Sequence, residues 1–304
     1  MKRDPRDSPP PSVEVQVEFG AESRGSPLRS ANEDHYVILR LSRHQETLMT
    51  SLPDQSLSER FDEYGYGMVV ADGVGGTGVG EAASRLAIAT LVDLAIYFGR
   101  WNVRIDDDIA REVMGRAERF FRAVDSTLLI QSANLPGAGL RTTLTAAFSA
   151  GRDLILAHVG HSRAYLLRSG RLTRLTRDHT LADEPAAGAG PLVDIAASVR
   201  DRHHILTETI GSTDLSGPMI DIERYRLKNG DLILLCTNGL TDTVGEDRIV
   251  DVLQSDRPCA EQCTALVNLA VEAGGDDDVT ALVARYRIPA KEGESVSEEG
   301  ESVL

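Results

Sequence analysis

The sequence predicts an α+β fold in which antiparallel strands form two stacked sheets and long helices pack against them. Short apolar or alternating runs follow one another closely along much of the 304-residue chain, whereas the helical patterns are few and long. Strands joined by short turns pair antiparallel, because a parallel pair needs a crossover of roughly a dozen residues or more. About nine such strands favour two stacked sheets over a single one.

The strands are predicted from alternation and from apolar runs. Residues 13–19, VEVQVEF, alternate cleanly, so one face of this strand is expected to be buried. Further strands are predicted at 66–71, 142–149, 153–159, 163–168, 171–176, 221–227, 231–237 and 279–287, with a strand-like run at 36–41. Their connections are short, as at Ser169-Gly170 and Asn229-Gly230, which is typical of antiparallel meanders.

The helices are predicted from apolar residues at helical spacing. Residues 81–98 carry such a pattern from Ala82 to Ile96. Residues from 106 to about 132 open with three aspartates, which favour a helix N-terminus because of the helix dipole. The remaining helical segments are predicted at 245–253 and 260–273.

One ordered domain is predicted over residues 13–288. Residues 1–12 and 289–304 are polar and rich in Pro, or in Glu and Ser, which is typical of disordered tails. Residues 182–203 are rich in Ala, Gly and Pro and separate two ordered-looking blocks. We therefore expect them to form a mobile, flap-like excursion over the surface of that domain.

The charge balance of the chain disfavours two classes of partner. The net charge is −15, of which the last 16 residues contribute −4 and the first 12 contribute +1, leaving −12 on the domain. So acidic a domain is a poor candidate for binding nucleic acid or an anionic membrane, and it is consistent with binding cations. No secretory signal or membrane-spanning apolar run is visible. We therefore expect a cytoplasmic protein, and a monomer.

The three cysteines are expected to be structural thiols. Their sparse, odd number argues against a disulfide framework. Cys259 and Cys263 lie four residues apart on a predicted helix, but neither a second pair nor a nearby His completes a zinc site. Cys236 stands alone at the end of an apolar run.

Acidic or amide residues stand beside glycine where several predicted strands begin or end. The segments are ANEDHY (31–36), VVADGVGG (69–76), LLCTNGLTD (234–242) and GGDDDVT (274–280). Each is a weak signal alone, because Asp-Gly is usually a turn and an acid cluster is usually a solvated loop. Asn238-Gly239 is open to two interpretations, a hairpin turn or the rim of a site, and Asn-Gly after a strand is a strong hairpin signal.

Together the four segments have a chemical rationale. Hard divalent cations prefer about six oxygen ligands from carboxylates, carbonyls and water. Acids from distant parts of the chain converge if their strands end at one rim of a sandwich, and glycine lets a backbone carbonyl turn toward an ion. Two cations about 3.5–4 Å apart can activate a water for attack on phosphorus.

The order of these segments resembles that of the metal-dependent protein serine/threonine phosphatases, the type 2C or PPM family, and its bacterial members in particular. The motifs are RSANEDHY (29–36), VVADGVGG (69–76), TTLTAAF (142–148), LAHVGHSRAYLLRSGRLTRLTRDHT (156–180), LTETIG (206–211), LILLCTNGLTD (232–242) and GGDDDVTALV (274–283). The resemblance implies a four-layer αββα sandwich with a metal site at one end. It also implies a signalling enzyme that opposes a serine/threonine kinase, hydrolysing phosphoserine and phosphothreonine on proteins with a water activated at a two-metal site.

The resemblance also implies the metal ligands. Asp72 matches the acid that bridges the two cations, Mn²⁺ or Mg²⁺, and Gly73 matches the residue that offers its carbonyl. Asp277 matches a late acid ligand. Glu33 and Asp34 match acids that hold metal-bound waters.

Arg29 matches the arginine that binds the substrate phosphate. A guanidinium suits this role, because its fork of donors can bind a phosphate dianion with two parallel hydrogen bonds. Without the surrounding motif, Arg29 would be taken for an ordinary surface arginine.

The sequence departs from the family pattern at three positions. His161 stands in VGHSR where relatives have an aspartate tied to a third cation, and imidazole is a poor Mg²⁺ ligand. Asn238 replaces an acidic ligand, so the second metal site is expected to be weakened. Val74 stands where animal members often have a His, and an apolar residue there is common in bacteria. Asp242 does match an acid near the third-metal region, but because of His161 the third cation site is expected to be altered or missing.

Two other functions compete with an active phosphatase. The first is a catalytically weak or inactive phosphatase-like module that binds phosphoproteins or metal ions, and Asn238 and His161 are the residues that favour it. The second is another acidic two-metal hydrolase such as a nuclease, which the negative domain and the absence of a basic stripe disfavour.

Overall fold

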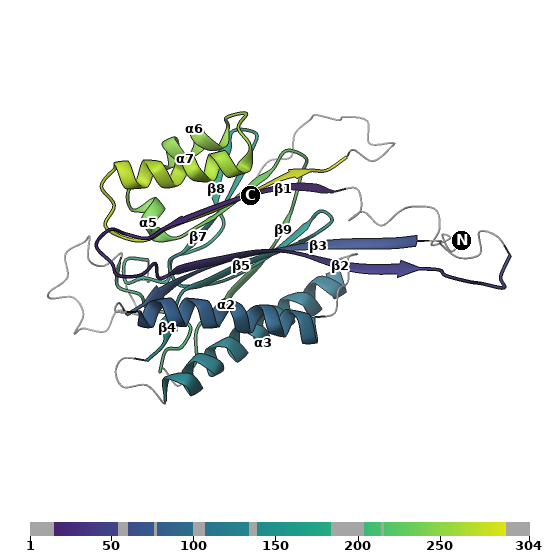
Figure 1. The fold of residues 1–304 in the computed structure, drawn as a ribbon, viewed down its shortest axis with the longest axis horizontal. Helices are drawn as coiled ribbons and strands as arrows, with labels where there is room; N and C mark the ends of the chain where they lie inside the picture. Colours follow the sequence, from purple (N-terminus) through teal and green to yellow (C-terminus); the bar gives the residue numbers. More distant parts are fainter. Residues whose placement is uncertain are drawn as a thin grey trace.

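The structure, a computed structural model, describes residues 15–53, 60–75, 78–99, 107–133, 139–183, 204–213 and 216–289. Two antiparallel sheets lie face to face, and helices cover the outer face of each (Figure 1). The predicted α+β sandwich of four layers is therefore confirmed.

The first sheet has the strand order β1-β11-β10-β7-β8. Its strands are β1 (Gln16–Arg24), β7 (Arg163–Arg168), β8 (Arg171–Arg174), β10 (Leu232–Cys236) and β11 (Val279–Arg287). The helices on its outer face are α5 (Asn238–Thr241), α6 (Glu246–Leu253) and α7 (Cys259–Glu272) (Figure 1).

The second sheet has the order β2-β3-β5-β6-β9, with a short strand β4 paired to β3. Its strands are β2 (Asp34–Glu46), β3 (Arg60–Val74), β4 (Arg141–Thr142), β5 (Leu144–Ala150), β6 (Asp153–Val159) and β9 (Asp221–Arg226). Helices α2 (Val79–Phe98) and α3 (Asp107–Ser132) cover its outer face (Figure 1).

Strand β10 explains why the central strands are continuous apolar runs in the sequence. Ile233 and Leu235 belong to the core between the two sheets, whereas Leu234 and Cys236 belong to the core under α7. All four side chains are completely buried. Because both faces of the strand are covered, every position along it has to be apolar.

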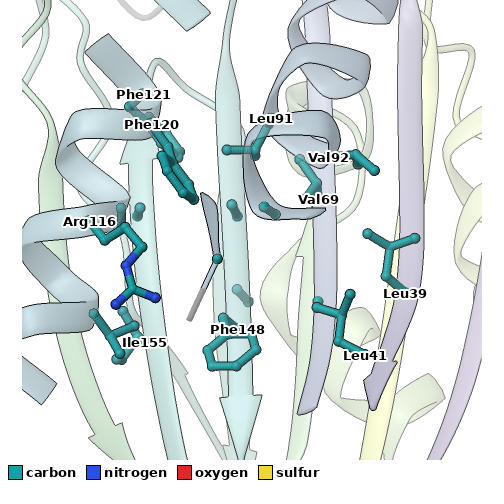
Figure 2. A pocket seen from close by; sticks show the side chains of 18 residues that line it. Leu39, Leu41, Val69, Leu91, Val92, Arg116, Phe120, Phe121, Phe148 and Ile155 are labelled. Carbon is teal, nitrogen blue, oxygen red and sulfur yellow. The ribbon is translucent and has the colours of Figure 1, made fainter. Parts of the chain in front are cut away.

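The helix layer over the second sheet leaves a cavity of about 140 Å³ (Figure 2). Its walls include Leu91, Phe120 and Phe148. Arg116 reaches into this lining from α3 and donates a hydrogen bond to Glu112 at 2.7 Å, which offsets part of the cost of burying a guanidinium. Among the described residues, those that line this cavity are distinct from those that line a larger cavity beside Asp72 and Asp277.

Several strands differ from their predicted bounds; for example, β1 extends to Arg24 and β3 begins at Arg60. The run at 142–149 is interrupted at Thr143, which separates β4 from β5. Thr143 leaves the strand pattern because its hydroxyl accepts the backbone N–H of Asp72 at 3.0 Å. The run at 36–41 is the middle of the longer strand β2, which pairs with β3 along its whole length.

Other sequence predictions are tested only in part. The predicted tail at 1–12, residues 184–203 of the predicted excursion and residues 290–304 lie outside the described residues. The cysteines are buried and free, as expected of structural thiols. No helix in the described ranges is long and apolar enough to cross a membrane.

Candidate active site

The acid-bearing segments meet at one end of the sandwich. In the second sheet, Asp34 at the start of β2 is the register partner of Asp72 near the end of β3. In the first sheet, Asn238 follows β10, and Asp277 precedes the neighbouring antiparallel strand β11. The two sheets are tied together here, because the hydroxyl of Thr237 donates to Oδ2 of Asp34 at 2.8 Å.

Asp72 has a fixed backbone and an electrostatically crowded carboxylate. Its carbonyl accepts the Thr143 N–H at 2.9 Å and the Thr142 hydroxyl at 2.8 Å. Its side chain is nearly buried, and burial, followed by the charges of Asp34 and Asp277, raises its pKa well above the ordinary value. A bound cation would relieve both the burial cost and the repulsion.

Asp34 lies deeper than Asp72 and is held from the first sheet. Its Oδ2 accepts the hydroxyls of Thr237 and Thr280, each at 2.8 Å. Its Oδ1 is buried and has no hydrogen-bond partner within the described chain. Burial raises the pKa of Asp34 to about 7, although the two threonine hydroxyls act in the opposite direction.

Arg29 lies among acids at the mouth of the site. Its Nη2 is 2.6 Å from Oδ1 of Asp277, and its Nη1 is 2.8 Å from Oε2 of Glu33. The guanidinium side chain is 34% exposed, so it faces solvent as well as the acids. An arginine so placed can exchange a carboxylate for a phosphate dianion without leaving the site.

Asp278 is a site-organising residue that the sequence did not single out from its two acidic neighbours. It is 1% exposed, and it accepts the backbone N–H groups of Ser26 at 2.7 Å and of Glu33 at 2.8 Å. These bonds fix the segment that carries Arg29. The available signal was its place directly before a buried strand, where a solvated acid is not expected.

Gly73 allows the end of β3 to meet the start of α2. A Cβ on Gly73 would lie 1.9 Å from the carbonyl oxygen of Gly80. A Cβ on Gly80 would in turn lie 2.7 Å from Cδ of Glu33. Glycine is therefore required at both positions, because a side chain would collide with the neighbouring segment. The interpretation of Asp72-Gly73 as a turn alone does not predict this requirement.

Asn238 is not in a hairpin turn. It is the first residue of α5 and is 6% exposed. Its Nδ2 donates to Oδ2 of Asp242 at 3.0 Å and to Oδ2 of Asp277 at 3.4 Å. The amide thus lies between two carboxylates as a neutral donor. Rotation of the amide by 180° would put its oxygen where Nδ2 now lies.

His161 lies beside Asp72, with 3.9 Å between its Nδ1 and Oδ2 of the acid. Burial lowers its pKa to about 4, so the imidazole is neutral at neutral pH. His204, which the sequence did not single out, places its Nδ1 3.6 Å from Oδ2 of Asp242. An uncharged ring therefore stands where the family pattern has a carboxylate.

Most of the candidate residues line one cavity of about 560 Å³, called here the acid-rich cavity. Its lining consists of Leu28, Arg29, Ser30, Ala31, Glu33, Asp72, Gly73, Val74, Gly75, His161, His204, Leu206 and Asp277. Of the other predicted site residues, Asp34 and Asn238 are more deeply buried, and Asp242 contacts the lining through His204.

The donor set fits oxygen-preferring divalent cations. Oδ1 of Asp34 and Oδ1 of Asn238 are buried without a hydrogen bond in the described chain, which is costly unless another partner binds them. Among the described residues, no three acidic or imidazole side chains already stand together in ligand geometry, and Asp277 is paired with Arg29. We therefore expect Arg29 to move away from Asp277 when a cation binds there.

Cation binding is expected to tighten as pH rises toward 7 and above. The raised pKa values of Asp34 and Asp72 mean that the folded protein holds protons that a cation must displace. For the same reason, these two acids contribute most to the stability of the EDTA-treated protein at low pH, and Asp34 loses its contribution as pH rises from about 4 through about 7. Calorimetric titration with Mn²⁺ between about pH 5 and pH 8, with Asp34→Asn as control, measures the effect, and an affinity independent of pH contradicts it.

Comparison with known sequences points to one family. The chain matches a family model described as protein phosphatase 2C over residues 51–279. It is 34% identical over 218 residues to the serine/threonine protein phosphatase PstP of Mycobacterium tuberculosis, covering 71% of this chain and 40% of that protein. It is 30% identical over 226 residues to the serine/threonine phosphatase stp of Listeria welshimeri, covering 74% of this chain and 86% of that protein. The chain therefore matches less than half of the mycobacterial protein's length.

Solved structures agree with these sequence matches. A crystal structure of Mycobacterium tuberculosis PstP superposes with a TM-score of 0.65 and 28% identity, over 89% of this chain and 99% of that chain. The catalytic domain of PstP in complex with two manganese ions superposes with a TM-score of 0.64 and 29% identity, over 90% of this chain and 99% of that chain. The S. agalactiae serine/threonine phosphatase superposes with a TM-score of 0.68, over 88% of this chain and 99% of that chain. At 23% identity, this likeness supports the fold alone.

Proposed function

Because the chain belongs to the protein phosphatase 2C family, we propose that it hydrolyses phosphoserine and phosphothreonine on proteins with two divalent cations. The observation that carries the proposal is the single cavity lined by Arg29, Asp72 and Asp277. Metal-assisted hydrolysis of a phosphate monoester uses carboxylates that hold the cations, and a guanidinium beside them suits the phosphate. The relative solved with two manganese ions supports the metal requirement.

Each acidic residue is assigned a role in holding the cations. Asp72 is assigned to bridge them, with the carbonyl of Gly73 and the carboxylate of Asp277 as further ligands, and Glu33 and Asp34 act through water. When bound, the cations supply an acidified water and offset the charge that develops on the phosphate. The threonine hydroxyls on Oδ2 of Asp34 leave its buried Oδ1 for this purpose.

Arg29 is assigned to the substrate phosphate. Its exchange from Asp277 to the phosphate frees that carboxylate, so substrate and cation binding are expected to support each other. Glu33 keeps the guanidinium oriented through the 2.8 Å contact with Nη1.

Replacing Arg29 with Lys is expected to raise KM about tenfold and to lower kcat less. Lysine keeps the positive charge but loses the two-pronged contact with the phosphate. Steady-state kinetics on a phosphothreonine peptide measure both constants. The matched control is Arg85→Lys, since Arg85 also pairs with a glutamate four residues away, Glu81 at 3.3 Å, but lies on the surface of α2. Equal effects of the two substitutions would exclude a phosphate contact by Arg29.

A phosphatase-like module with little or no turnover is the second candidate. Asn238 removes one ligand charge, and the neutral His161 removes another near the third-metal region. We favour an active enzyme with a weakened second metal site, because the acids assigned to the first and the arginine assigned to phosphate are all present.

The proposal is tested by phosphate release from phosphothreonine and phosphoserine peptides, and from p-nitrophenyl phosphate, across Mn²⁺ and Mg²⁺ titrations. We expect turnover that needs a cation, reaches half-maximum at a lower Mn²⁺ than Mg²⁺ concentration, and is abolished by EDTA. No turnover at any metal concentration, in protein shown to be folded by circular dichroism, contradicts the proposal. A single weak Mn²⁺ site without turnover would support the binding module.

The setting of the reaction remains a prediction from sequence. We propose phosphoprotein substrates in the cytoplasm, an opposing serine/threonine kinase, and a monomeric enzyme whose catalytic domain is residues 13–288.

A further inference from the structure

Gly160 immediately precedes His161, which lines the acid-rich cavity. Its φ of 111° favours glycine, and a Cβ on it would lie 2.6 Å from the Cβ of Thr143. Thr143 in turn accepts the backbone N–H of Asp72 at 3.0 Å. The position of Gly160 is therefore coupled, through one residue, to the acid at the centre of the site.

Two buried histidines, His158 and His179, hold Gly160 and are called here the histidine clamp. The N–H of Gly160 donates to Nδ1 of His179 at 3.2 Å, and the N–H of His179 donates back to the Gly160 carbonyl at 2.8 Å. Nε2 of His158 lies 3.0 Å from the same carbonyl oxygen. Both the donor and the acceptor of Gly160 are thus used by the clamp.

Each histidine of the clamp is fixed through its other ring nitrogen. Nε2 of His179 lies 3.1 Å from Oδ2 of Asp221, and Nδ1 of His158 lies 2.8 Å from the Thr145 hydroxyl. Because Nδ1 of His179 accepts the Gly160 N–H, its proton is on Nε2 and points to Asp221. Burial, and then the neighbouring His179, lowers the pKa of His158 to about 3, so that ring stays neutral.

The turn fixed by the clamp also contacts Thr143 through its side chains. The hydroxyl of Ser162, two residues after Gly160, is 2.8 Å from the hydroxyl of Thr143. Thr143 additionally donates its backbone N–H to the carbonyl of Asp72 at 2.9 Å. Hydrogen bonds link Asp221 to Gly160 through His179, and Thr143 to Asp72, and Thr143 occupies the space that a side chain on Gly160 would need.

We propose that His179 and His158 are positioning residues of the phosphatase reaction, which hold Asp72 in place through Gly160 and Thr143. This inference rests on the proposed function, since Asp72 is the acid assigned to both cations. Neither histidine lines the acid-rich cavity, so their effect on the reaction is indirect. The Gly160 contact acts on the site more directly, and the Asp221 contact acts by orienting the His179 ring.

Two substitutions of His179 separate these contacts. In His179→Asn the side-chain oxygen stands near the place of Nδ1, so it can accept the Gly160 N–H but falls short of Asp221. In His179→Gln the amide nitrogen reaches toward Asp221, but the acceptor for Gly160 is lost. Tyr286→Phe is the matched control, since it removes a buried 2.9 Å hydrogen bond to Ser149 at a place remote from the site. Asp221→Ala is a second variant, and because Asp221 is partly exposed we expect this substitution to disturb the fold less.

The readouts are the Mn²⁺ dissociation constant from calorimetry, kcat and KM on a phosphothreonine peptide, and Tm. We expect His179→Gln to weaken Mn²⁺ binding and to lower kcat, each about tenfold, with KM little changed. His179→Asn is expected to recover most of both losses, Asp221→Ala to show the same direction with smaller size, and Tyr286→Phe to lower Tm alone.

Equal metal affinity in His179→Gln and the wild type would overturn the inference, and so would losses in His179→Asn as large as those in His179→Gln. If the substitutions at His179 leave the protein unfolded, an unchanged metal affinity in Asp221→Ala overturns it instead. A wild type that binds Mn²⁺ without turnover contradicts the proposed function, while the metal affinities of the variants still decide the role of the clamp.

Discussion

Replacing Asp72 with Asn is expected to lower phosphate release by roughly a thousandfold or more. The substitution keeps the shape of the side chain but removes the charge assigned to bridge both cations. The loss of about 4 kcal/mol of charge stabilisation in the transition state corresponds to that factor. The measurement is kcat/KM on a phosphothreonine peptide at saturating Mn²⁺.

A second readout separates loss of metal from loss of fold in the Asp72→Asn variant. Burial and the charges of Asp34 and Asp277 raise the pKa of Asp72, so its ionised form destabilises the EDTA-treated protein. Removing that charge is expected to raise Tm in EDTA by a few degrees and to abolish the increase in Tm that Mn²⁺ gives the wild type. An inactive variant with a lower Tm in EDTA would mean that Asp72 serves the fold.

Replacing Asn238 with Asp is expected to tighten Mn²⁺ binding by about tenfold or more. The added carboxylate restores the ligand charge that the family pattern has at this position, and ligand charge tunes affinity. Activity at low Mn²⁺ concentration is therefore expected to rise, with less change at saturation. Calorimetry and a Mn²⁺ titration of activity measure the two effects.

Without metal ions, in EDTA, the Asn238→Asp substitution is expected to lower the stability of the protein. The amide of Asn238 now donates to Asp242 at 3.0 Å and to Asp277 at 3.4 Å, whereas an aspartate there would repel both. Tm in EDTA is therefore expected to fall while the shift in Tm produced by Mn²⁺ grows. The control is Asn229→Asp in the other Asn-Gly pair, where the side-chain oxygen already accepts the Ile288 N–H at 2.9 Å. If Mn²⁺ affinity and the Mn²⁺ dependence of activity are unchanged in Asn238→Asp, Asn238 has only a local structural role.

The layer structure could be predicted because it depends on local pattern. Alternation and apolar runs fix which strand faces are covered, as at β10, where the run LILLC is buried on both faces. The break at Thr143 could not be predicted, because nothing in TTLTAAF shows that a hydroxyl of this strand accepts the N–H of Asp72, 71 residues away.

The segments that form the candidate site could be predicted from the sequence, but the residues that hold these segments in place could not. Glycine beside an acid at strand ends marked Asp72 and Asp277, and the family resemblance assigned their roles. Asp278 escaped notice because its partners, the backbone N–H groups of Ser26 and Glu33, are distant in sequence. The histidine clamp escaped notice because hydrogen bonds from side chains to the backbone of Gly160 leave no pattern in the sequence. Asn238 was ambiguous because Asn-Gly after a strand has the same local chemistry in a hairpin and at the start of α5.

Anomalous diffraction from crystals grown with Mn²⁺ would locate the cations themselves. We expect two manganese peaks that share the carboxylate of Asp72, about 3.5–4 Å apart, with Arg29 displaced from Asp277. The peak nearer Asn238 is expected to have the lower occupancy. Manganese bound elsewhere on the acidic surface, with no peak at Asp72, would contradict this expectation.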